Sequence, residues 1–448
     1  MKFLNSFGLC AVLLSIAAGC GQTGPDSGKA DAKYNGLVLN EIAAHDEITD
    51  AVSWVEIVNS SSESKSLDGL SLYVSDAYFT DQSIATLSGS LVAGERLLLS
   101  TEDGTLRTGV ASNAPFTLVL GTSPTKAADS YTRSEDGPSL GLFASYQRIP
   151  DATGEWRKLT YSSQGKANEI FDISKTKPTA VWTWGSHMKD LLANDAANLK
   201  SLKDKGYDHI ILNFAAFSNQ GNIPTAKRFM QKANELGLVV HVWMQAFYNG
   251  GWISPIDDTN KCFKEEIFAS IREEAAEYIE NWGVKGVHLD YIRFGGTASK
   301  HDHSYEVNSV AAVNRCCKEI REICDGFDEG LITSAALMPE PNSTHYYGQS
   351  PAQMSKYIHI LMPMIYRYGS YNFSDSAFQE RSNYFARQAA KGGGVSWSGI
   401  QTYDASTVGM SAEAMRKDID LMAATDASGI VLFRYQLGTF PDVNDLWN

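Results

Sequence analysis

Residues 286–294 read Gly-Val-His-Leu-Asp-Tyr-Ile-Arg-Phe and lie between two long helical patterns. This short, largely apolar stretch is typical of a buried parallel strand, and strands of this kind deliver functional side chains at their C-terminal ends. Side chains alternate along a strand, so we expect His288, Asp290 and Ile292 to share one face. Asp290 is therefore the first candidate for a catalytic carboxylate.

Strand and helix patterns alternate from Lys177 to the end of the chain. The helical stretches are apolar on one face only, and several stop at a glycine, which favours a helix C-terminus. Eight such units in about 270 residues match a (β/α)8 TIM barrel in number and size. We predict this α/β barrel over residues 176–448. Its expected strands are 179–185, 209–216, 238–247, 286–294, 331–338, 359–366, 395–403 and 429–435.

Residues 35–170 have a different pattern, in which short alternating stretches are separated by turn residues. This spacing predicts an all-β sandwich. The expected strands include 37–42, 54–58, 70–74, 96–100 and 116–120. The chain is thus predicted to be multidomain, with the sandwich followed by the barrel.

Four groups of residues in this β-rich part resemble the lamin-tail domain. They are Asn40-Glu41-Ile42, the Trp-x-Glu-Ile-x-Asn motif at 54–59, the Leu-Asp-Gly-Leu run at 67–70, and residues 145–151. The resemblance covers nearly the whole of residues 35–170. It implies an immunoglobulin-like sandwich that serves as an accessory or adhesion unit and not as a catalyst.

The N-terminus has the features of a targeting segment. Lys2 precedes an apolar run at 7–18, and Ala17-Ala18-Gly19-Cys20 resembles a bacterial lipobox. The resemblance implies a signal peptide at 1–19, cleavage before Cys20 and lipidation of Cys20. Residues 20–34 are then a flexible tether, rich in Gly, Ser, Asp and Lys. We expect an exported, membrane-anchored bacterial lipoprotein at the outer membrane or cell surface.

The composition limits the partners of the protein. The 448 residues carry a formal net charge of −14, and no cluster of Lys and Arg suited to phosphate backbones is present. A nucleic-acid partner is therefore not expected, and contact with the membrane is expected through the lipid anchor only. The composition leaves the oligomeric state open.

Four cysteines remain once Cys10 and Cys20 are assigned to the targeting segment: Cys262, Cys316, Cys317 and Cys324. Export permits a disulfide, and Cys262 is the one that could pair with the other three, but the sequence does not decide this. No paired C-x-x-C spacing of a zinc site occurs. We predict neither a metal nor a cofactor.

Aromatic and polar residues gather at the predicted strand ends. Sugar rings stack on aromatic side chains and offer hydroxyl groups to amides, carboxylates and guanidinium groups, so this lining predicts a carbohydrate cleft. The candidate substrate-binding residues are Trp182, Trp184, Asn213, His241, Trp243, Gln245, His288, Arg293, Tyr366, Tyr403, Arg434 and Tyr435.

Glycosidic bond cleavage needs two carboxyl groups. Asp290 lies on the fourth predicted strand, Glu340 just past the fifth and Asp404 at the seventh, an order that resembles the α-amylase-like superfamily. Residues 286–294 and 362–366 also resemble bacterial glycoside-hydrolase-like barrel families, although Gly295 and Gly296 replace the usual proline. These resemblances imply Asp290 as nucleophile, Glu340 as general acid/base and Asp404 as transition-state stabiliser.

The sequence therefore predicts an exported lipoprotein glycoside hydrolase that cleaves an oligo- or polysaccharide by a two-carboxylate mechanism. Two alternatives remain. One is an inactive carbohydrate-binding or adhesive surface protein. The other is a metal-dependent amidase or deacetylase acting on cell-wall material, for which His301, His303 and the His288-x-Asp290 pair offer ligands.

Overall fold

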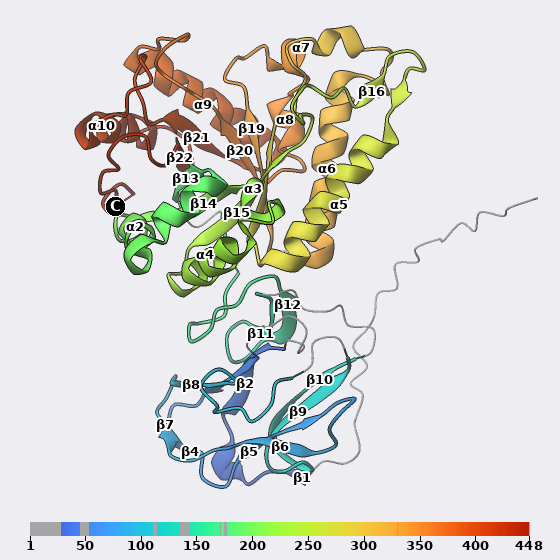
Figure 1. The fold of residues 1–448 in the computed structure, drawn as a ribbon, viewed down its shortest axis with the longest axis vertical. Helices are drawn as coiled ribbons and strands as arrows, with labels where there is room; N and C mark the ends of the chain where they lie inside the picture. Colours follow the sequence, from blue (N-terminus) through green and yellow to red (C-terminus); the bar gives the residue numbers. More distant parts are fainter. Residues whose placement is uncertain are drawn as a thin grey trace, which may run out of the picture.

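The computed structural model describes residues 28–44, 53–110, 114–134, 143–170, 172–173, 177–328 and 330–447. A strand-rich N-terminal part lies beneath a larger C-terminal barrel surrounded by helices (Figure 1). The predicted signal peptide and Cys20 lie outside the described residues.

The N-terminal part contains two five-stranded sheets. The first has the order β1 (Gly28–Lys29), β10 (Lys126–Arg133), β9 (Phe116–Ser123), β5 (Ser71–Ser75) and β6 (Gln82–Thr86). The second has the order β12 (Glu155–Leu159), β11 (Ser145–Ile149), β2 (Leu37–Ala43), β3 (Trp54–Asn59) and β8 (Arg96–Ser100). A small ladder pairs β4 (Lys65–Ser66) with β7 (Ser90–Leu91). The five strands expected here are confirmed.

The sheets share one apolar core, which includes Leu39, Ile57, Leu72 and Leu118, each 0% exposed. The C-terminal half of the expected tether is ordered against them, because β1 pairs in parallel with β10 and Tyr34 is buried. A short 3-10 helix, η1 (Ala32–Tyr34), leads into β2.

Two buried glutamates on β2 and β3 hold the segment that leads toward the barrel. Glu41 accepts hydrogen bonds from the Ser145 hydroxyl at 2.7 Å and from the Ser163 N–H at 2.9 Å. Glu56 accepts from the Gly165 N–H at 2.8 Å. Burial raises the pKa of Glu41 to about 7, although these hydrogen bonds act in the other direction.

The C-terminal part is a closed barrel of eight parallel strands. Each of the eight predicted strands is confirmed, with its end trimmed by one to four residues. In barrel order the strands are β13 (Thr179–Thr183), β14 (Tyr207–Asn213), β15 (Val239–Gln245), β18 (Gly286–Asp290), β19 (Ile332–Leu337), β20 (Ile360–Pro363), β21 (Val395–Gln401) and β22 (Gly429–Phe433).

Strand β18 is shorter than expected, and this corrects the predicted alternation of side chains. The strand ends at Asp290, and Tyr291 has a left-handed backbone with φ of 51°. Ile292 consequently packs with Leu289 in the core outside the barrel and does not share a face with Asp290. The turn gives Arg293 electrostatic contact with Asp290 instead.

Helices pack their apolar stripes against the outside of the barrel (Figure 1). The longer ones are α2 (Ala193–Asp204), α4 (Ile223–Glu235), α5 (Glu265–Trp282), α6 (Ser309–Phe327), α9 (Asp375–Gly392) and α10 (Ala412–Ala423). Short elements in the connecting loops are η2 (Gly185–His187), α1 (Met188–Leu191), α3 (Ala215–Ser218), β16 (Ile256–Asp257), β17 (Cys262–Phe263), η3 (Ala298–His301), α7 (Ser343–Tyr347) and α8 (Pro351–Met354).

Within the described residues no helix combines the length and apolar character needed to cross a bilayer. Cys316, Cys317 and Cys324 are buried in α6, whereas Cys262 is exposed. All four are free thiols, so no disulfide joins them.

The two parts meet at the N-terminal ends of the barrel strands, opposite Asp290. The Thr160 hydroxyl donates to the Val284 carbonyl oxygen at 2.9 Å. Gly283, which ends α5 in a left-handed conformation, lies so close to Phe143 that a Cβ atom would be 2.4 Å from that side chain. The junction is therefore packed and does not rest on a linker alone.

Glu41 should make the stability of the protein depend on pH. Its folded pKa of about 7 exceeds the unfolded value of 4.5, so stability should fall as pH rises between these values. The difference corresponds to on the order of 3 kcal/mol. In Glu41→Gln this component should be absent. Urea unfolding of both proteins at pH 5 and pH 8 measures it, and an equal pH dependence in both would contradict the assignment.

Candidate active site

Asp290 lies at the C-terminal end of β18 and is held by two donors. The indole N–H of Trp243 donates to Oδ2 at 3.1 Å, and the Tyr291 N–H donates to Oδ1 at 2.7 Å. Burial raises the pKa of the Asp290 carboxyl, and the two hydrogen bonds and the Arg293 charge oppose this only in part. Asp290 is thus a positioned carboxyl group with an increased affinity for a proton.

A polar layer inside the barrel supports Asp290 from below. His288 accepts a hydrogen bond at Nε2 from the Trp182 indole N–H at 3.2 Å, and its Nδ1 lies 2.9 Å from the Ser334 hydroxyl. His241 lies 2.9 Å from His209 through their ring nitrogens. Burial lowers the pKa of His241 to about 3 and that of His288 well below 6.5, so both rings are neutral.

This layer corrects three of the expected substrate contacts. His241 and His288 are 0% exposed and Trp182 is 2% exposed, so their side chains are closed off from solvent beneath Asp290. Glycines make room for two of these rings. A Cβ atom at Gly286 would lie 2.2 Å from His241, and one at Gly399 would lie 2.9 Å from Trp182.

Aromatic rings form the floor of the site. Trp184 stacks on Trp243 with ring centres 4.7 Å apart, and Tyr366 stacks on Phe433 at 5.5 Å. Trp243 and Phe433 meet edge to face at 6.2 Å, which joins the two pairs. Burial, followed by the neighbouring Tyr403 and Asp290, raises the pKa of the Tyr366 hydroxyl well above 10, so this group remains a neutral donor beside the carboxylate.

Arg293 connects Asp290 to the second carboxylate, Glu340. Its guanidinium group interacts electrostatically with both, although burial lowers the pKa of Arg293. The Nε atom of Arg293 is buried and has no hydrogen-bond partner among the described residues. The guanidinium therefore has hydrogen-bonding capacity left for a ligand.

Glu340 lies in the loop after β19, the strand that pairs in parallel with β18. Its Oε1 accepts hydrogen bonds from the hydroxyls of Tyr371 at 2.6 Å and Tyr347 at 3.5 Å. Its Oε2 is buried and finds no partner in the described part of the chain. The Arg381 guanidinium on α9 fixes this loop by donating to the Pro339 carbonyl at 2.5 Å.

Gln349 ties the two carboxylate-bearing loops together. Its side-chain amide donates to the carbonyls of Ile292 at 3.3 Å and Ala336 at 3.0 Å, and its Oε1 accepts from the Met338 N–H at 2.9 Å. The residue is fully buried. It thereby links the segment after Asp290 to the segment before Glu340.

A second group of aromatic residues forms a wall near Arg293, and these residues were not among those predicted from the sequence. Tyr248 stacks on Tyr291 with ring centres 4.5 Å apart, and the Arg293 guanidinium lies 4.5 Å from the centre of the Trp252 ring. Trp252 is 46% exposed. The sequence pattern from which this wall could have been predicted is a tyrosine and a tryptophan on either side of Asn249-Gly250-Gly251, directly after the third predicted strand.

Three further residues predicted for the site, Asp404, Tyr435 and Arg434, each have local contacts within the protein. Asp404 is exposed, and its carboxylate accepts from the backbone of Ser406 at 2.8 Å and Val408 at 3.0 Å, which shapes its own loop. The Tyr435 hydroxyl donates to Asp190 at 2.6 Å. Arg434 reaches His187 at 3.3 Å and contributes positive charge near Tyr403.

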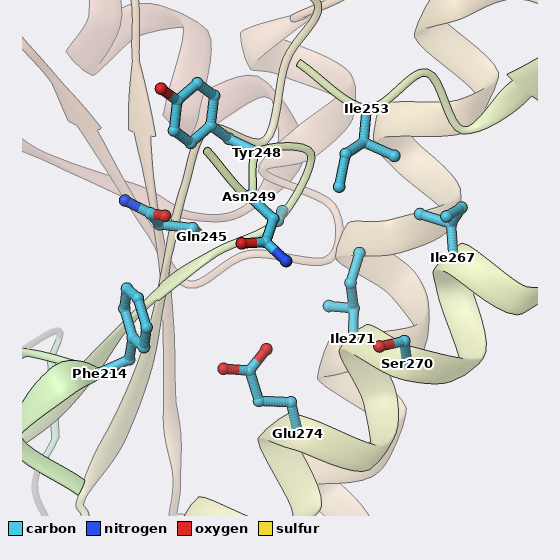
Figure 2. Close-up of a pocket in the computed structure, with 10 residues that line it drawn as sticks. Phe214, Gln245, Tyr248, Asn249, Ile253, Ile267, Ser270, Ile271 and Glu274 are labelled. Atoms are coloured by element: carbon cyan, nitrogen blue, oxygen red, sulfur yellow. The ribbon is translucent and has the colours of Figure 1, made fainter. Parts of the chain in front are cut away.

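Gln245 and Asn213 lie at the ends of neighbouring strands. Asn213 is 4% exposed, and its Oδ1 accepts from the Ala215 N–H at 3.2 Å. Gln245, which pairs in register with Asp290, lines a pocket of about 190 Å³ beside α5. In Figure 2 the carboxylate of Glu274 points into this pocket, below Asn249. Burial raises the pKa of Glu274, which also accepts a hydrogen bond from Tyr278 at 2.9 Å.

His301 and His303 have a defined structural partner. Both rings contact the carboxylate of Asp258, at 2.9 Å and 2.8 Å. No group of three or more His, Cys, Asp or Glu arranged for a metal occurs in the described ranges. These histidines hold the loop before α5 against η3.

Comparisons with known proteins give only distant likenesses. No protein-family model matches the chain, and no curated protein matches it. Among solved structures, the PgaB (BpsB) glycoside hydrolase domain from Bordetella bronchiseptica is 14% identical, with a TM-score of 0.43, over 57% of this chain and 94% of that domain. These likenesses are too weak to assign an activity.

Two further structures are similar at the same level. The GH5_18 protein from Streptomyces cattleya in complex with GlcNAc is 14% identical over 59% of this chain and 74% of that one, with a TM-score of 0.41. A β-glucuronidase 2 mutant from Bacteroides uniformis is 12% identical, with a TM-score of 0.39. That match covers 89% of this chain but only 46% of the other.

Asp290→Asn should stabilise the protein at neutral pH. The raised pKa of Asp290 means that its ionised form opposes folding, and this cost grows as pH rises above the ordinary aspartate value. The neutral amide removes the cost, so the thermal midpoint at pH 7 should rise by a few degrees and the gain should vanish near about pH 3.

Asp404→Asn is the matched control, because Asp404 is exposed and its amide equivalent can still accept from Ser406 and Val408. Its thermal midpoint should equal that of the wild type throughout the pH range. A lower midpoint for Asp290→Asn at pH 7 would show that the hydrogen bonds from Trp243 and Tyr291 outweigh the cost of burial.

Proposed function

We propose that the barrel is a glycoside hydrolase that acts on an oligo- or polysaccharide. The observation that carries this proposal is the pair Asp290 and Glu340. Asp290 ends β18, Glu340 follows the neighbouring parallel strand β19, and both interact with the guanidinium group of Arg293. Hydrolysis of a glycosidic bond needs one carboxyl group that holds a proton and one that is ionised.

The environments of the two carboxyl groups suggest their roles. Burial raises the pKa of Asp290, which suits a general acid that protonates the leaving oxygen. Glu340 accepts from two tyrosine hydroxyls on Oε1 and keeps a buried, unpartnered Oε2 within the described structure. That oxygen is suited to attack the anomeric carbon or to activate water. This assignment reverses the roles that the resemblance implied.

The residues around Asp290 and Glu340 suit a sugar chain. Trp184 and Phe433 offer apolar faces beneath the carboxylates, and Trp252 offers an exposed one at the side. Arg293 and Arg434 offer donors to hydroxyl or carboxylate groups of the substrate. Tyr366 and Tyr403 add hydroxyl groups, and that of Tyr366 interacts electrostatically with Asp290.

We further propose that the N-terminal part is an immunoglobulin-like, lamin-tail-type accessory module. Its two sheets around one core, and the burial of Asn40, Glu41 and Glu56 from the resembling motifs, support this. Lipidation of Cys20 would place the enzyme on a bacterial membrane, at the outer membrane or cell surface. If the barrel is a glycoside hydrolase, its partner is a carbohydrate substrate.

Two variants test the catalytic pair. With Asp290→Asn, turnover of natural glycosides should fall by roughly 10²–10⁴-fold. Aryl glycosides with an activated leaving group should lose much less, because their leaving oxygen needs little protonation. With Glu340→Gln, both substrate types should lose activity to a similar extent. Initial rates on a glycan library and on matched aryl glycosides measure this.

If Glu340→Gln, and not Asp290→Asn, kept more activity on aryl glycosides than on natural glycosides, Glu340 would be the general acid. Asp404→Asn serves as the control and should keep wild-type turnover, because its side chain shapes only its own loop. Full activity in both Asp290→Asn and Glu340→Gln would contradict the assignment of this catalytic pair, and absence of turnover in the wild type on every glycan would contradict the hydrolase proposal. Retained glycan binding without turnover in the wild type would favour a carbohydrate-binding surface protein.

Cys20→Ser tests the membrane anchor. The variant should lose the lipid and move from the membrane fraction to the soluble fraction, or keep its signal peptide, because a serine cannot form the thioether. Cell fractionation with mass spectrometry of the mature protein measures both effects. Unchanged partition and unchanged mature mass would contradict lipidation.

A further inference from the structure

A cavity of about 580 Å³ lies where the N-terminal part meets the base of the barrel. Tyr161, Lys166 and Glu169 line it from the segment that follows β12. Lys203 and Lys285 line it from the barrel side, next to the first residues of β14, β15 and β18. The cavity is therefore at the opposite end of the strands from Asp290.

Positive charge dominates the walls of this cavity. Four lysines line it, namely Lys166, Lys177, Lys203 and Lys285, together with two acids, Glu169 and Asp208. Lys203 pairs with Asp208 at 2.7 Å, which leaves three lysines and one glutamate. The protein as a whole carries a formal charge of −14, so the cavity is a local exception.

The other three lysines have weak partners. The ammonium group of Lys285 lies 4.5 Å from the centre of the Tyr161 ring, and that of Lys177 lies 5.5 Å from the Trp447 ring. Lys166 donates to the Glu235 carbonyl at 3.0 Å. Within the described ranges none of the three has a carboxylate within 4.0 Å. In the described part of the chain these three ammonium groups thus form no ion pair with a carboxylate.

The pKa values of two of these lysines are lowered, chiefly by burial and further by neighbouring lysines. Burial and the charges of Lys166 and Lys203 lower the pKa of Lys285 to about 8, and Glu41 and Glu169 offset this only in part. Burial and the charge of Lys203 likewise lower the pKa of Lys166. An anion in the cavity would relieve both effects, since it adds the charge that the lysines lack.

We propose that this cavity binds an organic molecule that carries a phosphate or sulfate group, with Lys285 as the main partner of the oxyanion. Lys166 and Lys203 lie close enough to act on Lys285 electrostatically and supply further positive charge. The volume is in the range of pockets that enclose small organic ligands and exceeds the needs of a bare ion. The Tyr161 ring offers an apolar face for the rest of the molecule.

Such a ligand would contact both parts of the chain at once. Lys166 belongs to the segment held by Glu41 and Glu56, whereas Lys203 lies in the last turn of α2 and Lys285 precedes β18. Binding would therefore stabilise the packed junction, and the thermal midpoint should rise with ligand concentration in a saturable way.

Calorimetric titration of the full chain tests the proposal. The probes are glucose 6-phosphate, inorganic phosphate and inorganic sulfate at constant ionic strength, with glucose as the neutral control. We expect saturable binding of glucose 6-phosphate, weaker binding of the inorganic ions and none of glucose. Lys285→Gln should bind at least tenfold more weakly. Lys227→Gln, which changes an exposed lysine on α4, should bind as the wild type does.

Lys166→Gln provides a second variant in case Lys285→Gln does not fold, because Lys166 lies on a surface segment and is only partly buried. It should weaken binding severalfold and leave the midpoint of the ligand-free protein nearly unchanged. No saturable binding in the wild type, or equal binding by the wild type and the folded lysine variants, would overturn the proposal. Equal affinity for inorganic phosphate and glucose 6-phosphate would overturn the assignment to an organic ligand.

Discussion

The hydrogen bonds of His288 join three strands directly beneath Asp290. Nε2 accepts from the Trp182 indole on β13, so in the neutral ring Nδ1 carries the hydrogen and donates to the Ser334 hydroxyl on β19. Because the ring is fully buried and uncharged, both bonds are made in a medium of low polarity. This arrangement fixes the height and orientation of β18 and thereby the position of its terminal carboxylate.

The site above this layer is built at a cost in stability. Asp290 and Arg293 are both partly buried, and burial shifts the pKa of each toward its neutral form. Their mutual attraction and the donors Trp243 and Tyr291 offset part of this cost. The large apolar core between strands and helices stabilises the fold enough to offset the remaining cost of burying Asp290 and Arg293. Unsatisfied groups such as Glu340 Oε2 mark where a substrate would complete the hydrogen bonds.

The residues that resemble the lamin-tail domain have a structural role in this chain. Asn40 donates to Glu56 at 2.7 Å, and Glu41 and Glu56 bind backbone N–H groups of residues 163–165. These bonds order the segment that carries Lys166 and continues toward the barrel. The two parts of the chain are thereby coupled through one short, hydrogen-bonded segment, and the lysine-lined cavity lies beside it.

The sequence by itself determined the order and nature of the elements. Apolar periodicity gave all eight barrel strands and five strands of the N-terminal part, because burial imposes that periodicity locally. The same periodicity placed Asp290 on one predicted strand and Glu340 just past the next. Periodicity could not show that Tyr291 turns into a left-handed conformation, which ends β18 and moves Ile292 outward and Arg293 toward Asp290.

Only the tertiary structure decided which polar residues at the strand ends are accessible and which are closed off from solvent. His241 and His288 have the same alternation as Asp290 but lie one or two layers lower, where they are closed off from solvent. Tyr248, Trp252 and Tyr371 come from loops whose paths depend on packing. The charge of the basal cavity likewise arises from lysines distant in sequence. Burial and mutual distance are properties of the folded chain, and they set the pKa and the accessibility on which chemistry depends.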